Sequence, residues 1–389
     1  MLPTKLSTEK VEDLVRSASI GEKIRKNTYG IMRIMSSQVD ETSRWLTSLW
    51  WRPGSLGLAG LWLLPLSALY RLTWWVRSAL FRWGLFAIHR APVPVVVVGN
   101  LVVGGGGKTP CTMALVKALK DLGWVPGVIS RGYKGSTRTA QAVCDVNGKW
   151  PDAQSVGDEP LLLAKRLRVP LWVGARRIEA ARALCAAHPE VNVLVCDDGL
   201  QHTALHRDAE LIVFDDRGVG NGHVLPAGPL RQPWTATPPA NSVVVYGGVR
   251  ASTPWSGDLA VRRLGRIWSF SDWAAGRQDT ARELSEWMEG PLAGEVHALA
   301  GIADPDQFFA MLRQAGLSLI PHPRADHVSA RAFEWPEGAR PIVITEKDAV
   351  KVPQSDPIIP RLWVATLDCE LPPHCVSTLV ERLSAARSC

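Results

Sequence analysis

The sequence predicts an α/β fold with two domains. A helical segment near the N-terminus precedes a domain with a mostly parallel sheet, and a second, smaller α/β domain comes after it. Short apolar runs of strand length alternate with Ala-, Leu- and Arg-rich stretches of helical length. A glycine-rich loop follows the first apolar run. The 389 residues exceed the length that one hydrophobic core usually supports, so we expect two domains.

The composition narrows the class of protein. A hydrophobic share of 46% and a charged share of 21% exclude wholesale disorder and a polytopic membrane protein. The net charge of +7 favours anionic partners such as nucleic acid, phosphorylated metabolites or acidic lipids. Seven scattered cysteines without a Cys-x-x-Cys pair, and an acidic N-terminus unlike a secretory signal, predict a protein that faces the cytoplasm.

The front of the chain divides into two segments. Residues 1–44 are polar and form an extension of unknown role, whereas residues 45–90 combine seven tryptophans with arginines. No acidic residue occurs between Glu41 and Asp121. The longest uncharged run, Pro53–Tyr70, is short for a bilayer span of roughly 20 residues and is broken by Gly and Pro. We therefore predict that 45–90 lies on a membrane surface rather than spanning it, with a Trp-rich helix pair packed on the core as the alternative.

Residues 91–215 are predicted to form the parallel-sheet domain. Its strands are expected at Val95–Val98, Gly127–Ser130, Leu171–Gly174, Val191–Cys196 and Leu211–Phe214. After a Pro- and Gly-rich connection at Arg217–Ala240, residues 216–389 are predicted to form the second domain, which closes a cleft. Its strands are expected at Ser242–Tyr246, Glu295–Ala300, Pro341–Thr345 and Leu362–Ala365, and its helices near Pro305–Gly316 and Val376–Ala386.

The glycine-rich loop indicates nucleotide binding. Gly104, Gly105, Gly106 and Gly107 precede Lys108 and Thr109, between a buried strand and a helix. In such a P-loop the backbone amides surround phosphate oxygens, the lysine reaches the terminal phosphates of ATP, and the threonine hydroxyl binds Mg²⁺. Val102 replaces the first glycine of the usual pattern, and we expect the additional glycines inside the loop to compensate, as in the GG-x-GKT loops of ParA/MinD-like ATPases.

Two acids are candidates to complete the Mg²⁺ site. Asp197 and Asp198 follow the apolar run Val191–Cys196, and a Walker-type loop needs a carboxylate at the end of a neighbouring strand. A helix N-cap is the other interpretation of this acid pair.

Several further motifs resemble one family. They are GN-LVV-GGGGKTP (Gly99 to Pro110), SRGY (Ser130 to Tyr133), GDEP (Gly157 to Pro160), DDGLQH (Asp197 to His202), GNGHVLPAGPLRQP (Gly220 to Pro233), ADH (Ala325 to His327) and TEKDAVK (Thr345 to Lys351). In order and spacing they resemble tetraacyldisaccharide 4′-kinase, the lipid A 4′-kinase of Gram-negative bacteria. The resemblance covers about residues 45 to 389. Gly106, Lys134 and Val328 depart from the family's usual residues.

The resemblance implies an enzyme that transfers the γ-phosphate of ATP to the 4′-hydroxyl of a lipid A disaccharide 1-phosphate. It implies two α/β/α domains around a cleft, at the cytoplasmic face of the bacterial inner membrane. Asp158 is then the candidate base, paired with His327 across the cleft, while Lys108 supports catalysis. Without the family, Asp158 would be a helix N-cap, and the sequence does not decide whether it takes the proton or only orients the hydroxyl.

Arg131, Asn221 and Arg231 lie inside the matched motifs, and we assign them to substrate binding. Guanidinium groups suit phosphates. The alternative functions are a ParA/MinD-like membrane ATPase switch and a DNA-binding module. Such switches usually carry a second lysine early in the glycine loop, where this chain has Val102 and Val103. The basic segment has no recognisable DNA-reading motif, which weakens the DNA-binding alternative. We expect a monomer without a nucleic-acid partner; acyl-chain preference is left open.

Overall fold

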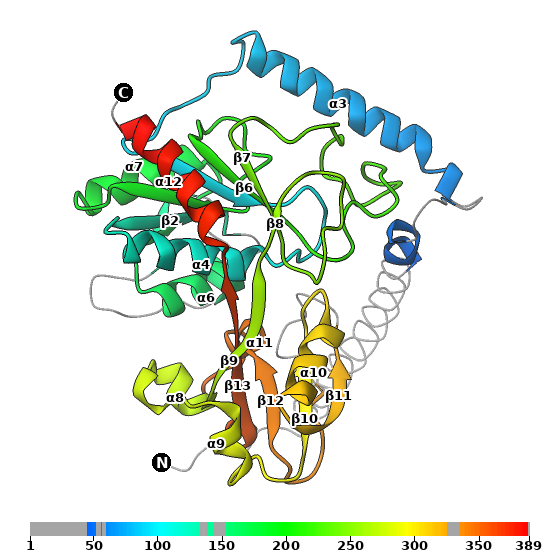
Figure 1. Ribbon diagram of the computed structural model, residues 1–389, viewed down its shortest axis with the longest axis vertical. Coiled ribbons are helices and arrows are strands. Elements are labelled where there is room, and N and C mark those ends of the chain that lie inside the picture. Colours follow the sequence, from blue (N-terminus) through cyan, green and yellow to red (C-terminus); the bar gives the residue numbers. More distant parts are fainter. Residues whose placement is uncertain are drawn as a thin grey trace, which may run out of the picture.

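The computed structural model describes residues 45–51, 56, 60–132, 135, 139–143, 153–324 and 334–387. The N-terminal extension 1–44 and the predicted base partner His327 lie outside these residues. The described chain forms two units, one above the other in Figure 1.

The first unit is built on a predominantly parallel sheet. Within the described residues it contains eight strands, in the spatial order β3 (Gln141–Ala142), β4 (Leu171–Val173), β2 (Pro126–Ser130), β5 (Val193–Asp197), β1 (Val95–Gly99), β6 (Ala209–Phe214), β7 (Ser242–Tyr246) and β8 (Asp258–Leu259). Only the edge strand β3 is antiparallel to its neighbour. β1 lies at the centre, where Val96 is in register with Val195 of β5 and Ala209 of β6. The predicted α/β class with a parallel sheet is confirmed.

Side chains alternate between the two faces of this sheet, as the pleat requires. Val96 and Val98 of β1 join one core, with α4 (Lys108–Asp121), α6 (Asp158–Leu167) and α12 (Pro373–Arg387). Val95 and Val97 join the other core. That core contains α7 (Arg177–Ala187) and the loops that carry Leu200 and Leu230. Both faces are therefore covered, which explains why the strands are continuous apolar runs. Short helix α5 (Ala153–Val156) precedes α6.

The second unit has its own sheet, one face of which packs in a separate core while the other face joins the core that α4 and α12 cover. Over the described part of the chain its five strands lie in the order β11 (Ser318–Pro323), β10 (Glu295–Ala300), β12 (Ile342–Thr345), β13 (Leu362–Glu370) and β9 (Val261–Ser269). Its helical elements are α8 (Phe270–Ala275), η1 (Gln278–Thr280), α9 (Leu284–Met288), α10 (Pro305–Gln314), α11 (Glu346–Ala349) and η3 (Ile359–Arg361). Fully buried Phe308 and Leu312 anchor α10 in the core beside Ala298 of β10 and Val343 of β12.

Two long antiparallel strands, β9 and β13, run from the first unit into the second (Figure 1). α12 then returns and packs on the first sheet, next to β6 and β7. The division of the sheets therefore differs from the expected boundary at residues 215 and 216, because β7, β8 and α12 all belong to the first unit. The physical reason is that a local apolar pattern defines a strand or a helix but does not say which sheet it joins.

Helix α3 (Leu64–Arg82) lies along the outside of the first unit (Figure 1). The Ser67 hydroxyl donates to the carbonyl of Val224 at 2.7 Å, and the Tyr70 hydroxyl donates to the carbonyl of Arg231 at 2.8 Å. Across the described ranges, no helix combines the length and apolar character needed to cross a membrane. α3 is thus tied to the segment that carries Arg231.

Replacement of Leu379 in α12 tests whether the C-terminal helix is part of the first unit's core. Leu379 is fully buried against that sheet, so Leu379→Ala is expected to lower the free energy of unfolding by about 2–5 kcal/mol. Urea unfolding measures the change. Glu381→Ala, on the exposed side of the same helix, is the matched control and is expected to change it by no more than about 0.5 kcal/mol. Equal effects of the two substitutions would contradict this packing.

Candidate active site

The glycine loop connects β1 to α4, whose first residue is Lys108. Gly104 and Gly107 have φ values of 87° and 76°, a region that side-chain-bearing residues rarely adopt. A Cβ atom on Gly106 would lie 2.8 Å from Nδ2 of Asn100, so a side chain at this position would require the Asn100 amide to shift. The predicted P-loop therefore has a strand before it, a helix after it and a backbone that depends on glycine.

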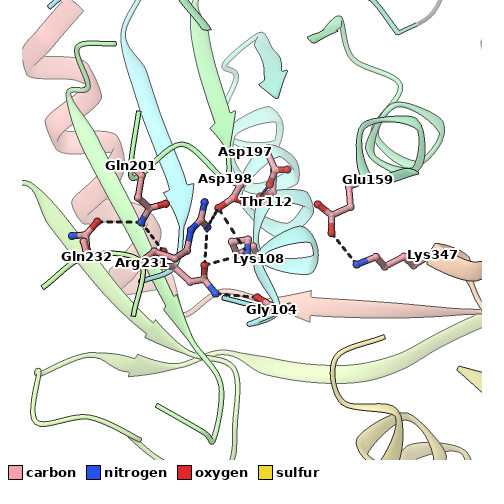
Figure 2. Close-up of polar contacts among 12 residues, drawn as sticks. Gly104, Lys108, Thr112, Glu159, Asp197, Asp198, Gln201, Arg231, Gln232 and Lys347 are labelled. Atoms are coloured by element: carbon pink, nitrogen blue, oxygen red, sulfur yellow. Dashed lines mark hydrogen bonds and ion pairs between the residues drawn. The ribbon is translucent and has the colours of Figure 1, made fainter. Parts of the chain in front are cut away.

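Lys108 points toward the acids at the end of β5 (Figure 2). Its Nζ donates to Oδ1 of Asn100 at 3.1 Å and lies 3.8 Å from Oδ1 of Asp198. Arg231 Nη1 donates to the same Asp198 oxygen at 2.7 Å. Burial raises the pKa of Asp198, but Lys108 and Arg231 outweigh it, so the net pKa lies below its usual value. Asp198 is consequently an ionised carboxylate between two cations.

Asp197, the last residue of β5, is in a different environment. It is 2% exposed, and its Oδ1 accepts a hydrogen bond from Thr112 Oγ1 at 2.8 Å. Burial, followed by the charges of Glu159 and Asp198, raises the pKa of Asp197 to about 7. Asp198 and Glu159 each contact a cationic side chain, whereas Asp197 contacts the Thr112 hydroxyl, so the charge of Asp197 is the one that an added cation would stabilise.

The donors around Asp197 fit Mg²⁺, which prefers oxygen ligands and usually takes only one or two protein carboxylates in addition to phosphates and water. Thr109 is the second residue of α4 and is half-buried. No cluster of three or more His, Cys, Asp or Glu side chains suited to a metal occurs in the described part of the chain. A P-loop site does not need such a cluster, because substrate phosphates supply ligands.

The second unit reaches this site through the TEKDAVK segment. Lys347 Nζ donates to Oε1 of Glu159 at 2.9 Å (Figure 2). Arg166 of α6 pairs with Glu346 at 3.2 Å and also with Asp368. Burial raises the pKa of Glu346 although Arg166 opposes the shift. These pairs join α6 to α11 and β13 across the two units.

Two glutamines connect further motifs behind the loop. Gln201 Nε2 donates to the Asn100 carbonyl and to Oε1 of Gln232, both at 3.1 Å (Figure 2). Thus the DDGLQH motif, the GNGHVLPAGPLRQP motif and Asn100, the residue after β1, meet at one place.

Comparisons with known proteins give the family. The family model described as tetraacyldisaccharide-1-P 4′-kinase (LpxK) matches residues 59–384. The chain belongs to this family. It is 45% identical to the tetraacyldisaccharide 4′-kinase of Leptothrix cholodnii, over 91% of this chain and 99% of that protein. It is 42% identical to the protein of the same name from Acidovorax sp. strain JS42, over 88% and 95%. A solved structure of LpxK from Aquifex aeolicus in complex with ATP has 26% identity and a TM-score of 0.66, and the match covers 84% of this chain and 99% of that one.

Four of the residues predicted from the motifs of the tetraacyldisaccharide 4′-kinase family lie together in the structure (Figure 2). They are Lys108, Asp197, Asp198 and Arg231. Asp158 is the first residue of α6, directly before Glu159. Their catalytic and metal-binding roles stay predictions.

The other two predicted substrate residues lie elsewhere. Arg131 follows β2 and is exposed. Asn221 donates to the carbonyls of Ala227 at 2.9 Å and Leu49 at 3.4 Å, and its Oδ1 accepts from the His223 amide. Its described partners are backbone groups, which favours a role in shaping the loop that holds Arg231.

Sequence reasoning missed several side chains of the site. Asn100, Thr112, Gln201 and Gln232 contact the predicted residues or each other, and Glu159 pairs with Lys347. All but Thr112 lie within or directly beside the family motifs, which was the available signal. Thr112 had none, because a threonine inside a helix carries no pattern of its own.

Proposed function

We propose that this chain phosphorylates the 4′-hydroxyl of a tetraacyldisaccharide 1-phosphate, with ATP as the donor. The observation that carries the proposal is the placement of Lys108 between Asn100 and Asp198 at the mouth of a glycine loop, in a chain of this family. Such a loop positions phosphates, and phosphoryl transfer depends mainly on positioning and charge neutralisation.

Mg²⁺ would be held by Thr109 together with Asp197 and Asp198. When bound, it neutralises charge on the phosphates that are being separated. Lys108 would leave Asp198 for the terminal phosphates, while Arg231 continues to hold that carboxylate. Arg131, from the end of β2, would then bind substrate phosphates, together with the part of the Arg231 guanidinium that does not contact Asp198. Asn221 would maintain the loop that carries Arg231.

Asp158 would orient the acceptor hydroxyl and accept its proton. Its place at the start of α6 brings it beside Glu159, which contacts Lys347 of the second unit. We assign His327 as its partner from that unit, by the family motif. An acid and an imidazole from different units meet only when the units close, which limits hydrolysis of ATP by water.

The lipid substrate would be reached at the cytoplasmic face of the inner membrane through α3. One side of α3 is tied to the first unit by Ser67 and Tyr70. Leu66, Leu69 and Leu72 are each more than half exposed and recur at three-residue spacing. Arginines and no acids accompany them, so this side suits the boundary between acyl chains and anionic headgroups. We expect a monomer.

Transfer of ³²P from labelled ATP to a purified tetraacyldisaccharide 1-phosphate tests the activity. Label is expected in the lipid, in a Mg²⁺-dependent manner. Label that appears only as free phosphate would reject the kinase and favour a ParA/MinD-like ATPase switch.

Two charges on α3 test the membrane contact. Leu69→Asp with Leu72→Asp is expected to reduce co-sedimentation with anionic phospholipid vesicles by about tenfold or more, because both side chains would leave the acyl boundary. Leu122→Asp, at another exposed leucine outside α3, is the control and should sediment like the unmodified protein. Undiminished binding of the α3 variant would place the contact elsewhere.

A further inference from the structure

Arg262 lies on β9, one of the two strands that join the units (Figure 1). Its guanidinium contacts the glycine loop. Its register partner on β13 is Cys369, and β13 packs against α4, the helix that follows the loop. The strand therefore brings a cation from the connection between the units to the N-terminal end of α4.

The guanidinium of Arg262 bridges the loop and the second unit. Nη2 donates to the carbonyl of Gly106 at 3.3 Å, and Nη1 donates to Oε1 of Gln307 at 3.1 Å. Gln307 lies in the first turn of α10, where its backbone amide donates to the capping side chain of Asp304. One side chain thus connects a P-loop carbonyl with a helix of the other sheet.

The surroundings are shaped for this guanidinium. A Cβ atom on Gly107 would lie 1.7 Å from Nη2 of Arg262, and one on Gly247 would lie 2.2 Å from it. Among the residues that the structure describes, no carboxylate forms an ion pair with Arg262, and its buried Nε has no hydrogen-bond partner. A positive charge without an acidic partner is therefore held beside the loop.

The contact with Gly106 has a consequence for the next amide. In a planar trans peptide the C=O and the following N–H point in opposite directions. Because the Gly106 carbonyl points toward Arg262, the N–H of Gly107 points away from the guanidinium. In a phosphate-binding loop, backbone amides of this kind face the phosphate oxygens.

We propose that Arg262 is a positioning residue for the nucleotide: it fixes the glycine loop through Gly106 and ties that loop to α10 through Gln307. The inference rests on the proposed function, because it requires that the loop binds ATP. The two contacts couple the position of α10 to that of the glycine loop.

Equilibrium binding of a fluorescent ATP analogue with Mg²⁺ to the full chain tests the proposal. Arg262→Ala is expected to weaken binding about tenfold, the size of one charged hydrogen bond. Gln307→Leu is expected to weaken it about threefold, because the arginine loses one of its two anchors. The double variant should bind no more weakly than Arg262→Ala, since both substitutions break one connection. Arg262→Lys should be intermediate, because one ammonium group does not span both acceptors.

Arg263→Ala is the matched control on the same strand. Arg263 is largely exposed and pairs with Glu370 at 3.4 Å, so its loss should leave ATP binding unchanged. Melting temperatures are recorded for all variants. A lower melting temperature with unchanged affinity would overturn the proposal, as would losses for Arg262→Ala and Gln307→Leu that multiply in the double variant.

If Arg262→Ala does not fold, Gln307→Leu and Arg262→Lys test the positioning role instead. An affinity for the ATP analogue equal to that of the unmodified chain in both variants would overturn the proposal. Failure of the unmodified chain to bind ATP would overturn the proposed function and this inference together. Normal binding by a folded Arg262→Ala variant overturns this inference alone.

Discussion

Lys108→Ala is expected to lower phosphate transfer by a factor on the order of 10²–10³, the usual effect of removing one group that stabilises charge in a transition state. The physical reason is that the Lys108 ammonium would neutralise the terminal phosphates as the bond to the donor breaks. Transfer of ³²P to the lipid, measured with saturating ATP, gives the effect on turnover.

The fold should survive this substitution. Lys108 contacts Asn100 and Asp198 at the mouth of the loop, and Arg231 remains to hold Asp198. Lys117→Ala, at an exposed lysine of the same helix, is the control and should retain full activity. Lys108→Ala that unfolds, or that keeps full activity, would contradict the assignment.

The elements that the sequence predicted most accurately are those with a local cause. The apolar run Val95–Val98 became β1, and Ser242–Tyr246 became β7 with the same bounds. Pro305 marked the start of α10, with Asp304 as its cap. Each of these depends on residues that are neighbours in the chain, which is why pattern reasoning reached them.

β9 illustrates what the sequence did not predict. Its segment, Val261–Ser269, contains three arginines and a glycine, so it lacks the apolar alternation of a typical strand, and its first six residues are exposed or only partly buried. It is a strand because β13 offers a long antiparallel partner. A strand whose stability comes from such a distant partner carries little local signal.

The candidate site divides in the same way. The glycine loop and the acid pair were predicted because each follows an apolar strand of a parallel sheet. The link between Lys347 and Glu159 depends on residues 188 positions apart, and only the approach of the two units brings them together. Arg262 is similar, because its contacts arise from the path of β9 rather than from its neighbours in sequence.

The different environments of the two adjacent acids suggest different tasks. Asp198 is neutralised by Lys108 and Arg231, whereas Asp197 is buried, has a raised pKa and contacts only a hydroxyl group among its described hydrogen-bond partners. Asp198 therefore holds cations in place when no phosphate is bound. Asp197 is the acid whose charge most requires a metal ion.

Asp197→Asn is accordingly expected to lower phosphate transfer by a factor on the order of 10²–10³ and to raise the Mg²⁺ concentration needed for half-maximal activity. Asparagine keeps an oxygen that can accept from Thr112, so the substitution removes the charge but not the hydrogen bond. A Mg²⁺ titration of ³²P transfer measures both effects. Thr112→Val is the complementary variant, because it removes the hydrogen bond and keeps the charge; it should reduce activity much less. Equal losses in the two variants would contradict a role that depends on the charge of Asp197.

Without metal, Asp197→Asn should lose less stability than the unmodified chain as the pH rises. Because the pKa of Asp197 is about 7 in the fold and 3.8 in the reference state, the folded protein retains a proton that the unfolded chain has released. The contribution of this group to stability is therefore complete below about pH 4 and is lost as pH rises through about 7. Thermal unfolding in EDTA at pH 5 and pH 8 should show a smaller loss for Asp197→Asn than for the unmodified chain. If the stability of Asp197→Asn and of the unmodified chain depended on pH in the same way, Asp197 would not carry the buried charge. An acid that lowers the stability of the metal-free fold and is nevertheless necessary for phosphate transfer is what a metal-binding role requires.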